Sequence, residues 1–189
     1  MAAGLLLAAG AGRRMGGPKA LVELDGEPLV RGALRVLADG GCAPRVVVVG
    51  AAADAVRAIL PEDVTAVEAA DWAEGMGASL RTGLAALPPD VDAVLVHLVD
   101  LPGVTAAAVG RLADRAGPTT LRRASYHGRP AHPVVLGRDH WAGVVASAKG
   151  DAGARDYLKA NPALELVECA DIATPGDVDT PDALARWLR

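Results

Sequence analysis

The sequence predicts an α/β fold, in which a mostly parallel β-sheet lies between two layers of helices. Two observations support this prediction. Short apolar runs alternate with segments of helical periodicity along most of the 189 residues, as a parallel sheet with crossover helices requires. In addition, residues 45–49 read RVVVV, and a strand that is apolar on both faces is typical of a sheet centre covered on each side.

The first 118 residues contain four predicted strand–helix pairs. Uninterrupted apolar runs predict strands at residues 4–8, 45–49, 65–68 and 92–98. Apolar residues at helical spacing predict helices at residues 29–38, 53–60, 78–87 and 105–116. Residues 63–64 and 88–89 interrupt the pattern, and we expect connections there.

After about residue 118 the alternation changes. Strands are predicted at residues 119–124 and 133–136 on either side of a turn-rich stretch at residues 126–130, followed by helices at 139–148 and 154–160, a strand at 164–169 and a helix at 181–187. No internal repeat or long linker divides the chain. We therefore predict a single domain over residues 1–189, whose last third completes the sheet and supplies a second wall of a cleft.

Composition excludes several classes of function. The net charge of −4 argues against a nucleic-acid partner, which would need a basic face. No run approaches 18 apolar residues, so we expect no membrane partner, and the apolar start has no basic leader of a secretory signal. Cys42 and Cys169 are isolated in the sequence. They predict free buried thiols in a reducing cytoplasm rather than a zinc site.

A glycine-rich loop follows the first predicted strand, where residues 10–19 read GAGRRMGGPK. Glycine lets main-chain amides approach a phosphate closely, and two arginines and a lysine add fixed positive charge. The spacing is not G-x-G-x-x-G, because Met15 stands where the third glycine should be, and Pro18 breaks the P-loop pattern. The loop therefore predicts a triphosphate cradle of another kind, over residues 10–16.

Residues 7–19 fit the signature L-A-A-G-x-G-x-R-M-G-x-x-K at every specified position. This segment resembles the N-terminal loop of the molybdenum cofactor nucleotidyltransferases and of related sugar-nucleotide pyrophosphorylases. The resemblance implies a three-layer, Rossmann-like fold of the nucleotide-diphospho-sugar transferase type. The other interpretation is a tight strand-to-helix turn with incidental surface arginines.

The resemblance also implies a set of nucleotide contacts. Arg14 would clamp the β- and γ-phosphates, because its guanidinium offers a fork of donors, and Lys19 would lie at the α-phosphate; Arg13 either joins them or points into solvent. Residues 75–80 resemble the G-M-G-x-S-L element of the family, although Ser79 could instead cap its helix. The predicted nucleotide-binding residues are Leu7, Ala8, Ala9, Gly10, Ala11, Gly12, Arg13, Arg14, Lys19, Gly77 and Ser79.

Nucleotidyl transfer brings an anionic nucleophile to a polyanion, so it depends on positioning and on cations. Asp100 follows the strand at 92–98, where open α/β sheets place ligands, and it resembles the D-x-P aspartate that binds magnesium. Asp179 belongs to a segment similar to a C-terminal D-x-D-T-P element, which also suits a helix start. We expect Mg²⁺ on Asp100 and Asp179, with Arg14, Lys19 and Asp100 catalytic.

Neighbouring residues receive structural interpretations. Asp177 and Asp182 are predicted to be solvated. His97, within a buried strand, is predicted to be a hydrogen-bonded histidine of the core rather than a ligand.

Three motifs resemble the cytidylyl-transferring branch of the family: L-A-A-G at residues 7–10, G-x-x-x-H-P-V at 128–134 and G-D-x-G-A-R at 150–155. They imply CTP and a molybdopterin-type acceptor, bound by His132, Asp151 and Arg155, although Asp151 could cap the following helix. Few aromatic side chains are available to stack a pterin; Tyr126 and Trp141 are the nearest in sequence.

The resemblance therefore implies transfer of CMP from CTP to the phosphate of a molybdopterin-type cofactor, with release of pyrophosphate. A molybdenum enzyme or its maturation factor would be a transient partner. The alternatives are GTP as donor, a sugar or polyol phosphate as acceptor, and a non-catalytic nucleotide-binding accessory protein. The joint presence of Arg14, Lys19, Asp100 and Asp179 argues against the last.

Overall fold

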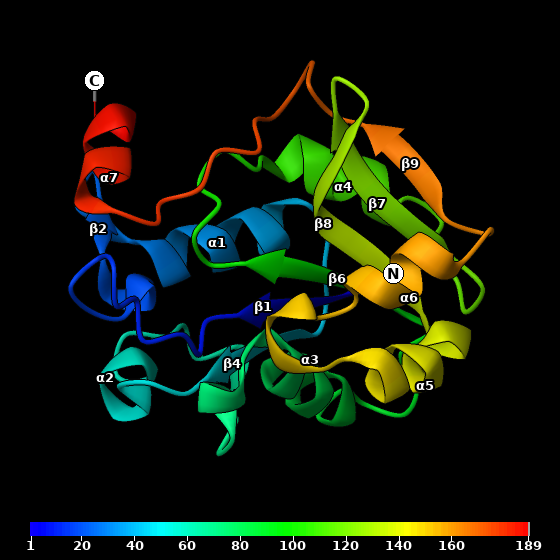
Figure 1. Cartoon of the computed structure of the whole chain (residues 1–189), viewed down its shortest axis with the longest axis horizontal. Helices are drawn as coiled ribbons and strands as arrows, with labels where there is room; N and C mark the ends of the chain where they lie inside the picture. Colours follow the sequence, from blue (N-terminus) through cyan, green and yellow to red (C-terminus); the bar gives the residue numbers. More distant parts are fainter. Residues whose placement is uncertain (189) are drawn as a thin grey trace.

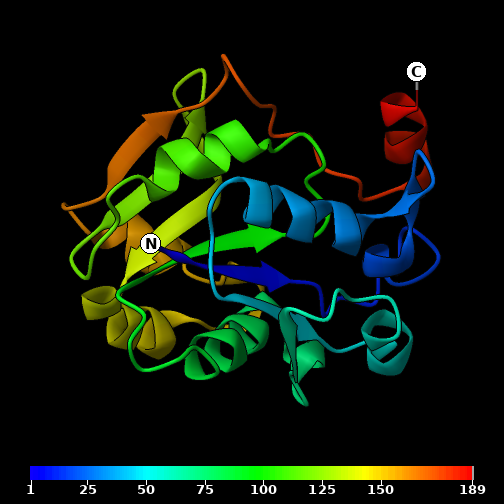
Figure 2. The same ribbon diagram turned by 180° about the vertical axis from the view of Figure 1, so that it is seen from behind.

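The computed structural model describes residues 1–188, and a seven-stranded sheet lies at its centre with helices on both faces (Figures 1 and 2). The strand order is β5-β4-β1-β6-β8-β7-β9. The neighbours from β5 to β6 are parallel, β8 is antiparallel to both β6 and β7, and β9 is parallel to β7. The predicted mostly parallel α/β sheet is confirmed.

The elements have the following bounds. The strands are β1 (Ala3–Leu7), β2 (Glu23–Leu24), β3 (Glu27–Pro28), β4 (Arg45–Val49), β5 (Val64–Glu68), β6 (Ala93–Leu98), β7 (Leu121–Tyr126), β8 (Arg129–Gly137) and β9 (Glu165–Glu168). The helices are α1 (Leu29–Asp39), α2 (Ala53–Arg57), α3 (Met76–Ala85), α4 (Ala106–Ala113), α5 (Arg138–Ser147), α6 (Arg155–Ala160) and α7 (Pro181–Trp187). Short 3-10 turns form η1 (Lys19–Leu21), η2 (Trp72–Glu74) and η3 (Gly150–Ala152).

Side chains alternate between the two faces of the sheet, and those on each face form a separate hydrophobic core. One core lies under α1, α2 and α4 and includes Leu6 of β1, whereas the other lies under α3, α5 and α6 and includes Leu5 and Leu7. Both consist mainly of leucine, valine and alanine, since the chain has no phenylalanine. Small side chains let the helices approach the sheet closely, so many small contacts stabilise the fold.

The path of the chain reverses direction across the sheet after β5. From β1 the chain moves outward through β4 to β5, with α1 and α2 on one face, and then α3 crosses the other face and brings β6 to the opposite side of β1. Neighbouring parallel strands whose connections diverge in this way leave a crevice at their carboxyl ends, where α/β proteins bind ligands. That crevice opens beyond Leu7 and Leu98.

Most predicted elements differ from the observed ones only at their ends, and three differences are larger or change the assignment of a residue. The helix predicted at 53–60 ends at Arg57, and Val64 begins β5 rather than lying in a connection. The predicted turn-rich stretch at 126–130 is mostly strand, because only His127 and Gly128 turn, with φ values of 52° and 75°. A two-residue turn with positive φ at both positions matches the twist of a β-hairpin.

The β2–β3 hairpin was not predicted, because strands of two residues have no periodicity to detect. Within residues 1–188, no helix has both the length and the apolar character needed to cross a membrane.

Candidate active site

A cleft of about 490 Å³ opens at the carboxyl ends of β1 and β6. Its walls come from six parts of the chain: the end of β1 with the glycine-rich loop, η1, the η2–α3 junction, the end of β6 with the segment after it, η3 and the segment before α7. Its lining residues are Leu7, Ala9, Gly10, Ala11, Gly12, Arg13, Arg14, Lys19, Trp72, Ala73, Gly75, Met76, Ser79, Leu98, Val99, Asp100, Asp151 and Asp179. We call this cavity the nucleotide cleft.

The glycine-rich loop folds around the carbonyl oxygen of Gly12. This oxygen accepts from the amides of Met15, Gly16 and Gly17 at 2.9, 3.0 and 3.2 Å. Gly12 has a φ of +59°, and a Cβ there would overlap the carbonyl oxygen of Gly17, so glycine is needed. Within the described residues the amides from 10 to 14 donate to no protein acceptor. Of the cradle predicted at residues 10–16, the amides of residues 10–14 are therefore the ones left for a phosphate.

Four charged side chains meet at the mouth of this loop. The Nζ of Lys19 donates to Oδ2 of Asp100 at 2.7 Å and to Oδ1 of Asp179 at 2.6 Å, and Nη1 of Arg14 donates to Oδ2 of Asp179 at 2.8 Å. Partial burial lowers the pKa of Lys19, but the two carboxylates outweigh burial and raise it. Lys19, followed by Arg14, lowers the pKa of Asp179. Lys19 is thus an ammonium held between two carboxylates.

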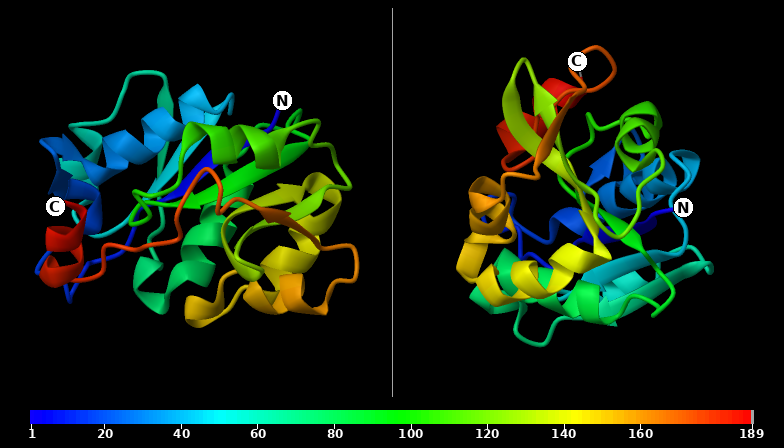
Figure 3. Two further views of the ribbon diagram at one scale, coloured as in Figure 1. Left: turned by 90° about the horizontal axis from the view of Figure 1, so that it is seen from above. Right: turned by 90° about the vertical axis from the view of Figure 1, so that its right-hand side faces the viewer.

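Backbone hydrogen bonds bring the two aspartates side by side. The amide of Val99 donates to the carbonyl of Leu7 at 3.2 Å, which fixes the start of the Asp100 segment on β1. The amide of Val178 donates to the carbonyl of Asp100 at 2.9 Å, so Asp179 follows directly beside Asp100. Figure 3 shows the C-terminal segment, orange to red, running past the green segment after β6 to α7 beside the blue loop.

The structure also shows which residues cap the helices that follow the two aspartates. Thr105, not Asp100, caps α4, with its side chain accepting from Ala108. Thr180 caps α7 and Pro181 occupies its first turn, so the helix start and the cleft position of Asp179 coexist. Asp177 and Asp182 are exposed, as expected for solvated carboxylates.

The charged cluster fits a divalent cation. Its two carboxylates converge on one point, which the Lys19 ammonium occupies, and carboxylate oxygens are the ligands that Mg²⁺ and Mn²⁺ prefer. No group of three or more acidic, histidine or cysteine side chains suitable for a metal occurs within residues 1–188. A cation held by Asp100 and Asp179 would therefore complete its shell with phosphate oxygens and water.

Two predicted nucleotide contacts lie away from the cleft. Ala8 is buried in the core under α1. A Cβ on Gly77 would lie 2.9 Å from the carbonyl carbon of Ala148, so Gly77 serves close packing of α3 on the loop after α5. Ser79 does line the cleft. It lies inside α3 rather than at its start, so the cap interpretation of Ser79 is wrong.

Trp72 is a cleft residue that the sequence analysis did not identify. It lies in η2 and packs on Gly50, where a Cβ would lie 2.6 Å from the indole Cγ. The indole lines the cleft beside Ser79 and the start of α3 and offers a flat surface to a base. A tryptophan next to the G-M-G element was the available signal.

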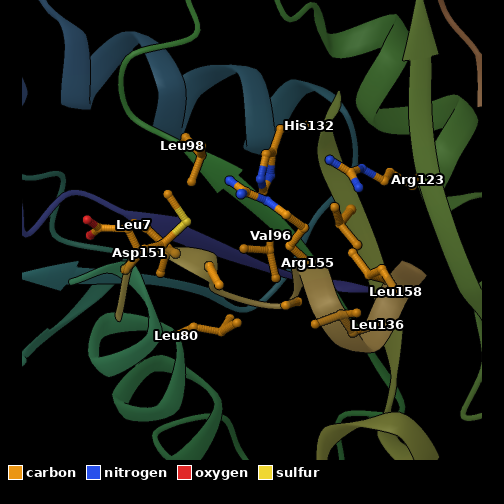
Figure 4. Close-up of a pocket in the computed structure, with 14 residues that line it drawn as sticks. Leu7, Leu80, Val96, Leu98, Arg123, His132, Leu136, Asp151, Arg155 and Leu158 are labelled. Atoms are coloured by element: carbon orange, nitrogen blue, oxygen red, sulfur yellow. The ribbon is translucent and has the colours of Figure 1, made fainter. Parts of the chain in front are cut away.

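A second cavity of about 190 Å³ adjoins the nucleotide cleft, and the two share Leu7, Met76, Leu98 and Asp151 (Figure 4). It contains all three predicted acceptor residues, His132, Asp151 and Arg155, together with Arg123, which was not predicted. The rest of its lining is mostly apolar: Leu80, Val96, Val134, Leu136, Ala152, Ala154 and Leu158. We call it the acceptor pocket.

Several side chains near the acceptor pocket differ from expectation. Asp151 caps no helix, because Ala154 precedes α6. Tyr126 and Trp141 do not line the pocket; the Tyr126 hydroxyl donates to the carbonyl of His132, and the Trp141 indole donates to that of Leu136. The pocket therefore stacks no ligand on tyrosine or tryptophan.

Two histidines of the sheet have a buried Nδ1 without a hydrogen-bond partner. Burial, followed by the charge of Arg123, lowers the pKa of His132 to about 4, and burial lowers that of His97 to about 3. Both rings are neutral near pH 7. His97 is a core residue as expected, but the prediction that it is fully hydrogen-bonded is wrong.

The fold and the cleft are those of an α/β protein of the nucleotidyltransferase type, in which a glycine-rich loop faces paired carboxylates. Residues 4–166 match the MobA-like NTP transferase domain, and the chain belongs to this family.

The relatives and solved structures match most of the chain. Nicotine blue oxidoreductase of Paenarthrobacter nicotinovorans is 41% identical, over 98% of this chain and 95% of that protein. Molybdenum cofactor guanylyltransferase of Rhodobacter capsulatus is 36% identical, over 76% of this chain and 67% of its own length. The crystal structure of Rv0371c from Mycobacterium tuberculosis H37Rv has a TM-score of 0.83 at 27% identity, covering 98% of this chain and 96% of its own. Its manganese complex has a TM-score of 0.78 at 28% identity, covering 98% and 97%.

Proposed function

We propose that this protein is a divalent-metal-dependent nucleotidyltransferase that transfers CMP from CTP to the phosphate of a molybdopterin-type acceptor. The observation that carries the proposal is the Lys19 ammonium held between Asp100 and Asp179 at the mouth of the phosphate loop. A site for binding alone has no electrostatic need for two carboxylates among its phosphate-binding cations. Membership of the MobA-like NTP transferase domain family supports the same reaction class.

The reaction requires one bond to form and one to break at the α-phosphorus of CTP. An oxygen of the acceptor phosphate attacks the α-phosphorus, and the bond to the oxygen bridging α and β breaks, so that its electron pair leaves with pyrophosphate. A phosphate monoester is largely dianionic near neutral pH, so the nucleophile needs no general base. The site therefore has to position two polyanions and offset their repulsion.

The residues of the nucleotide cleft divide this task. The free amides at residues 10–14 and the Arg14 guanidinium hold the β- and γ-phosphates, where the leaving group forms. Lys19 moves from the two carboxylates to the α-phosphate, and Trp72 with Ser79 receives the base and ribose. Asp100 and Asp179 would hold Mg²⁺, which neutralises phosphate charge when bound.

The adjacent acceptor pocket supports the identity of the second substrate. It opens into the nucleotide cleft at Leu7, Leu98 and Asp151, so a phosphate bound there can reach the α-phosphate. The L-A-A-G loop resembles the cytidylyl-transferring branch and is our basis for CTP. Cys42 and Cys169 are free and buried, which fits a reaction in the reducing cytoplasm followed by transfer of the product to a molybdenum enzyme.

The test is nucleotide-dependent pyrophosphate release. Purified protein with molybdopterin and Mg²⁺ should release pyrophosphate faster with CTP than with GTP, and a chelator should stop the release until Mg²⁺ or Mn²⁺ is restored. Faster release with GTP would overturn the base assignment. Release only with a sugar or polyol phosphate would overturn the acceptor assignment.

A second candidate function is oxidoreduction, favoured by the full-length relative named nicotine blue oxidoreductase at 41% identity. In this reading the phosphate loop would hold the pyrophosphate of a dinucleotide, and the acceptor pocket would hold the compound that is reduced. NADH and NADPH with nicotine blue test it directly. Loss of dye absorbance at the rate of reduced-dinucleotide oxidation, without pyrophosphate release from CTP, would replace the transferase proposal.

A further inference from the structure

Arg81 joins three parts of the chain that enclose one side of the nucleotide cleft. It lies on α3, and its Nη1 donates to the carbonyl of Ala148 at 2.7 Å, just before η3. Its Nη2 donates to Oδ2 of Asp71 at 3.2 Å and to Oε2 of Glu74 at 3.3 Å. These two carboxylates come before and after Trp72 in the chain. One guanidinium therefore connects η2 and η3 through α3.

The two turns depend on neighbouring elements because little within them holds their shape. Each has three residues, and neither has a side chain that caps it. Inside η3, the amide of Ala152 donates to the carbonyl of Lys149 at 3.2 Å. A 3-10 turn has poorer hydrogen-bond geometry than an α-helix. A charge-assisted bond from outside is therefore a substantial part of what fixes each turn.

The turns also touch each other, with no space for a side chain between them. Gly75 ends η2, and a Cβ there would lie 2.5 Å from Oδ1 of Asp151 and 2.6 Å from the carbonyl carbon of Gly150. Figure 1 shows the segment between α5 and α6 running past α3. A shift of either turn would therefore displace the other, and with it the cleft residues Trp72 and Asp151.

Arg81 itself lines neither cavity, so any effect that it has on a ligand is indirect. Its side chain is 32% exposed, and solvent screens the two ion pairs, so neither carboxylate alone would hold η2 firmly. The bond to the Ala148 carbonyl is the shortest of the three. None of the three involves the glycine-rich loop, so the phosphate half of the cleft should not depend on Arg81.

We propose that Arg81 is a positioning residue that clamps η2 to η3 and thereby fixes the indole of Trp72 as the surface against which the base lies. A planar guanidinium suits this task, because its fork can serve the carboxylates and the carbonyl at the same time. The consequence for nucleotide binding rests on the proposed function, whereas the clamp between the two turns does not.

Amide hydrogen exchange of the ligand-free full chain tests the clamp. In Arg81→Ala, the hydrogen-bonded amides of the two turns, such as those of Gly75 and Ala152, should exchange at least about tenfold faster than in the wild type. The amides of β1 should keep the wild-type rate. Unchanged exchange in the turns, or equal acceleration in β1, would overturn the proposal.

Arg111→Ala is the matched control. The Arg111 guanidinium likewise bonds a carbonyl, that of Glu168 at 2.7 Å, and a carboxylate, that of Asp171 at 2.7 and 2.8 Å. Its side chain is 38% exposed and lines neither cavity. This variant should leave exchange in η2 and η3 at the wild-type rate. Acceleration there equal to that in Arg81→Ala would show a general effect of losing an arginine and would overturn the proposal.

Two ligands test the consequence for the nucleotide. In calorimetry with Mg²⁺, Arg81→Ala should bind CTP at least about tenfold more weakly than the wild type, while its affinity for inorganic triphosphate stays within about twofold. Only CTP carries a base that can reach Trp72. Equal losses for both ligands would contradict a positioning role. Arg81→Lys keeps the charge but not the fork, so it should restore only part of the CTP affinity, and full restoration would overturn the clamp.

The exchange and binding experiments separate the clamp from the proposed function. If the wild type binds neither CTP nor triphosphate, the proposed function fails, and hydrogen exchange still decides whether Arg81 clamps the turns. If the wild type binds CTP and Arg81→Ala matches it in both measurements, the proposed function stands and the clamp is overturned.

Discussion

The two adjoining cavities handle charge in opposite ways. In the nucleotide cleft, Lys19 and Arg14 are paired with Asp100 and Asp179, and the loop amides at residues 10–14 donate to no acceptor in the described part of the chain. In the acceptor pocket, Arg123 and Arg155 form no ion pair within residues 1–188, and the surroundings are mostly apolar. Binding of a cation and a nucleotide in the cleft would replace existing ion pairs with new ones. Binding of an anion in the pocket would neutralise the two arginines without breaking an ion pair.

This difference separates two kinds of specificity. Under the proposed function, Lys19 leaves the two carboxylates when phosphates arrive, and a divalent cation would replace it there for the transfer step. The pocket has no such exchange, so its selectivity depends on shape and on desolvation of the ligand. Variants in the cleft should therefore change turnover or nucleotide binding, and a variant on the acceptor side should change stability.

The largest effect is expected from Asp100 in the cleft. Asp100→Ala should lower the rate of pyrophosphate release about 10²–10³-fold. The variant removes one of the two carboxylates of the candidate metal site, and with it one of the two hydrogen bonds that position Lys19. CTP affinity, measured by calorimetry without acceptor, should change far less. Asp177→Ala, an exposed aspartate two residues from Asp179, should behave as the wild type. Equal losses of turnover and CTP binding in Asp100→Ala would indicate a protein that only binds nucleotide.

The second effect concerns the shape of the phosphate loop. Gly12→Ala should weaken CTP binding at least about tenfold, because the residue has a φ of +59° and its Cβ would overlap Gly17. Gly17→Ala has open space and no positive φ, so its CTP affinity should stay close to that of the wild type. Equilibrium binding and circular dichroism of both variants make the comparison. Normal affinity in Gly12→Ala would mean that the loop amides do not form the cradle.

The third effect compares the two neighbouring arginines of the loop. Arg14→Ala should raise the KM for CTP about three- to tenfold, because the ion pair with Asp179 holds the Arg14 guanidinium at the mouth of the loop, where it would meet the phosphates. The effect is limited because 79% of the side chain is exposed and solvent screens its charge. Arg13→Ala should raise it less, since Arg13 lines the cleft without an ion pair in the described chain. Steady-state kinetics of the two variants decide the order, and the reverse order would exchange their roles.

The smallest effect concerns the stability of the acceptor side. The carboxylate of Glu168 accepts from the amides of Gly128, His127 and Ala170, which lowers its pKa to about 2. Because the folded pKa lies below the ordinary value of 4.5, this stabilisation is present above about pH 4.5 and is lost as pH falls toward 2. Glu168→Gln should lower the Tm by a few degrees at pH 7 and by less near pH 3.

Thermal unfolding at both pH values checks this, with Glu62→Gln as control, because Glu62 is exposed and makes no ion pair in the described residues. A difference between Glu168→Gln and the wild type that stays constant with pH would contradict the role of charge. Such a result would mean that hydrogen bonds alone, without the charge of Glu168, stabilise the turn between β7 and β8.

The nucleotide cleft was largely predictable because its residues lie in contiguous motifs. A glycine loop after a strand and an aspartate leaving the next buried strand both follow from general rules of α/β sheets. The exclusion of Ala8 and Gly77 was not predictable, because which side of a strand or helix faces a ligand depends on packing against Ala148 and the α1 core. Trp72 lies in an irregular connection that no periodicity describes.

Arg123 was missed for a different reason, since no motif surrounds it. The sequence did hold one signal: two adjacent arginines, Arg122 and Arg123, in a strand whose residues alternate between faces. One of them had to face the inner side of the sheet. Arg122 binds the carbonyls of Leu112 and Asp114, which leaves Arg123 to the pocket.

The hydrogen bond from the Val178 amide to the Asp100 carbonyl would also determine at which point during synthesis the protein can become active. The cluster joins positions separated by 81, 160 and 165 residues along the chain, so it is among the last contacts that a folding chain can close. A nascent chain on the ribosome would carry its phosphate loop long before residue 179 emerges. Under the proposed function, chemistry would therefore wait until residue 179 has been made, and a product that stops before it would retain the loop without the second carboxylate.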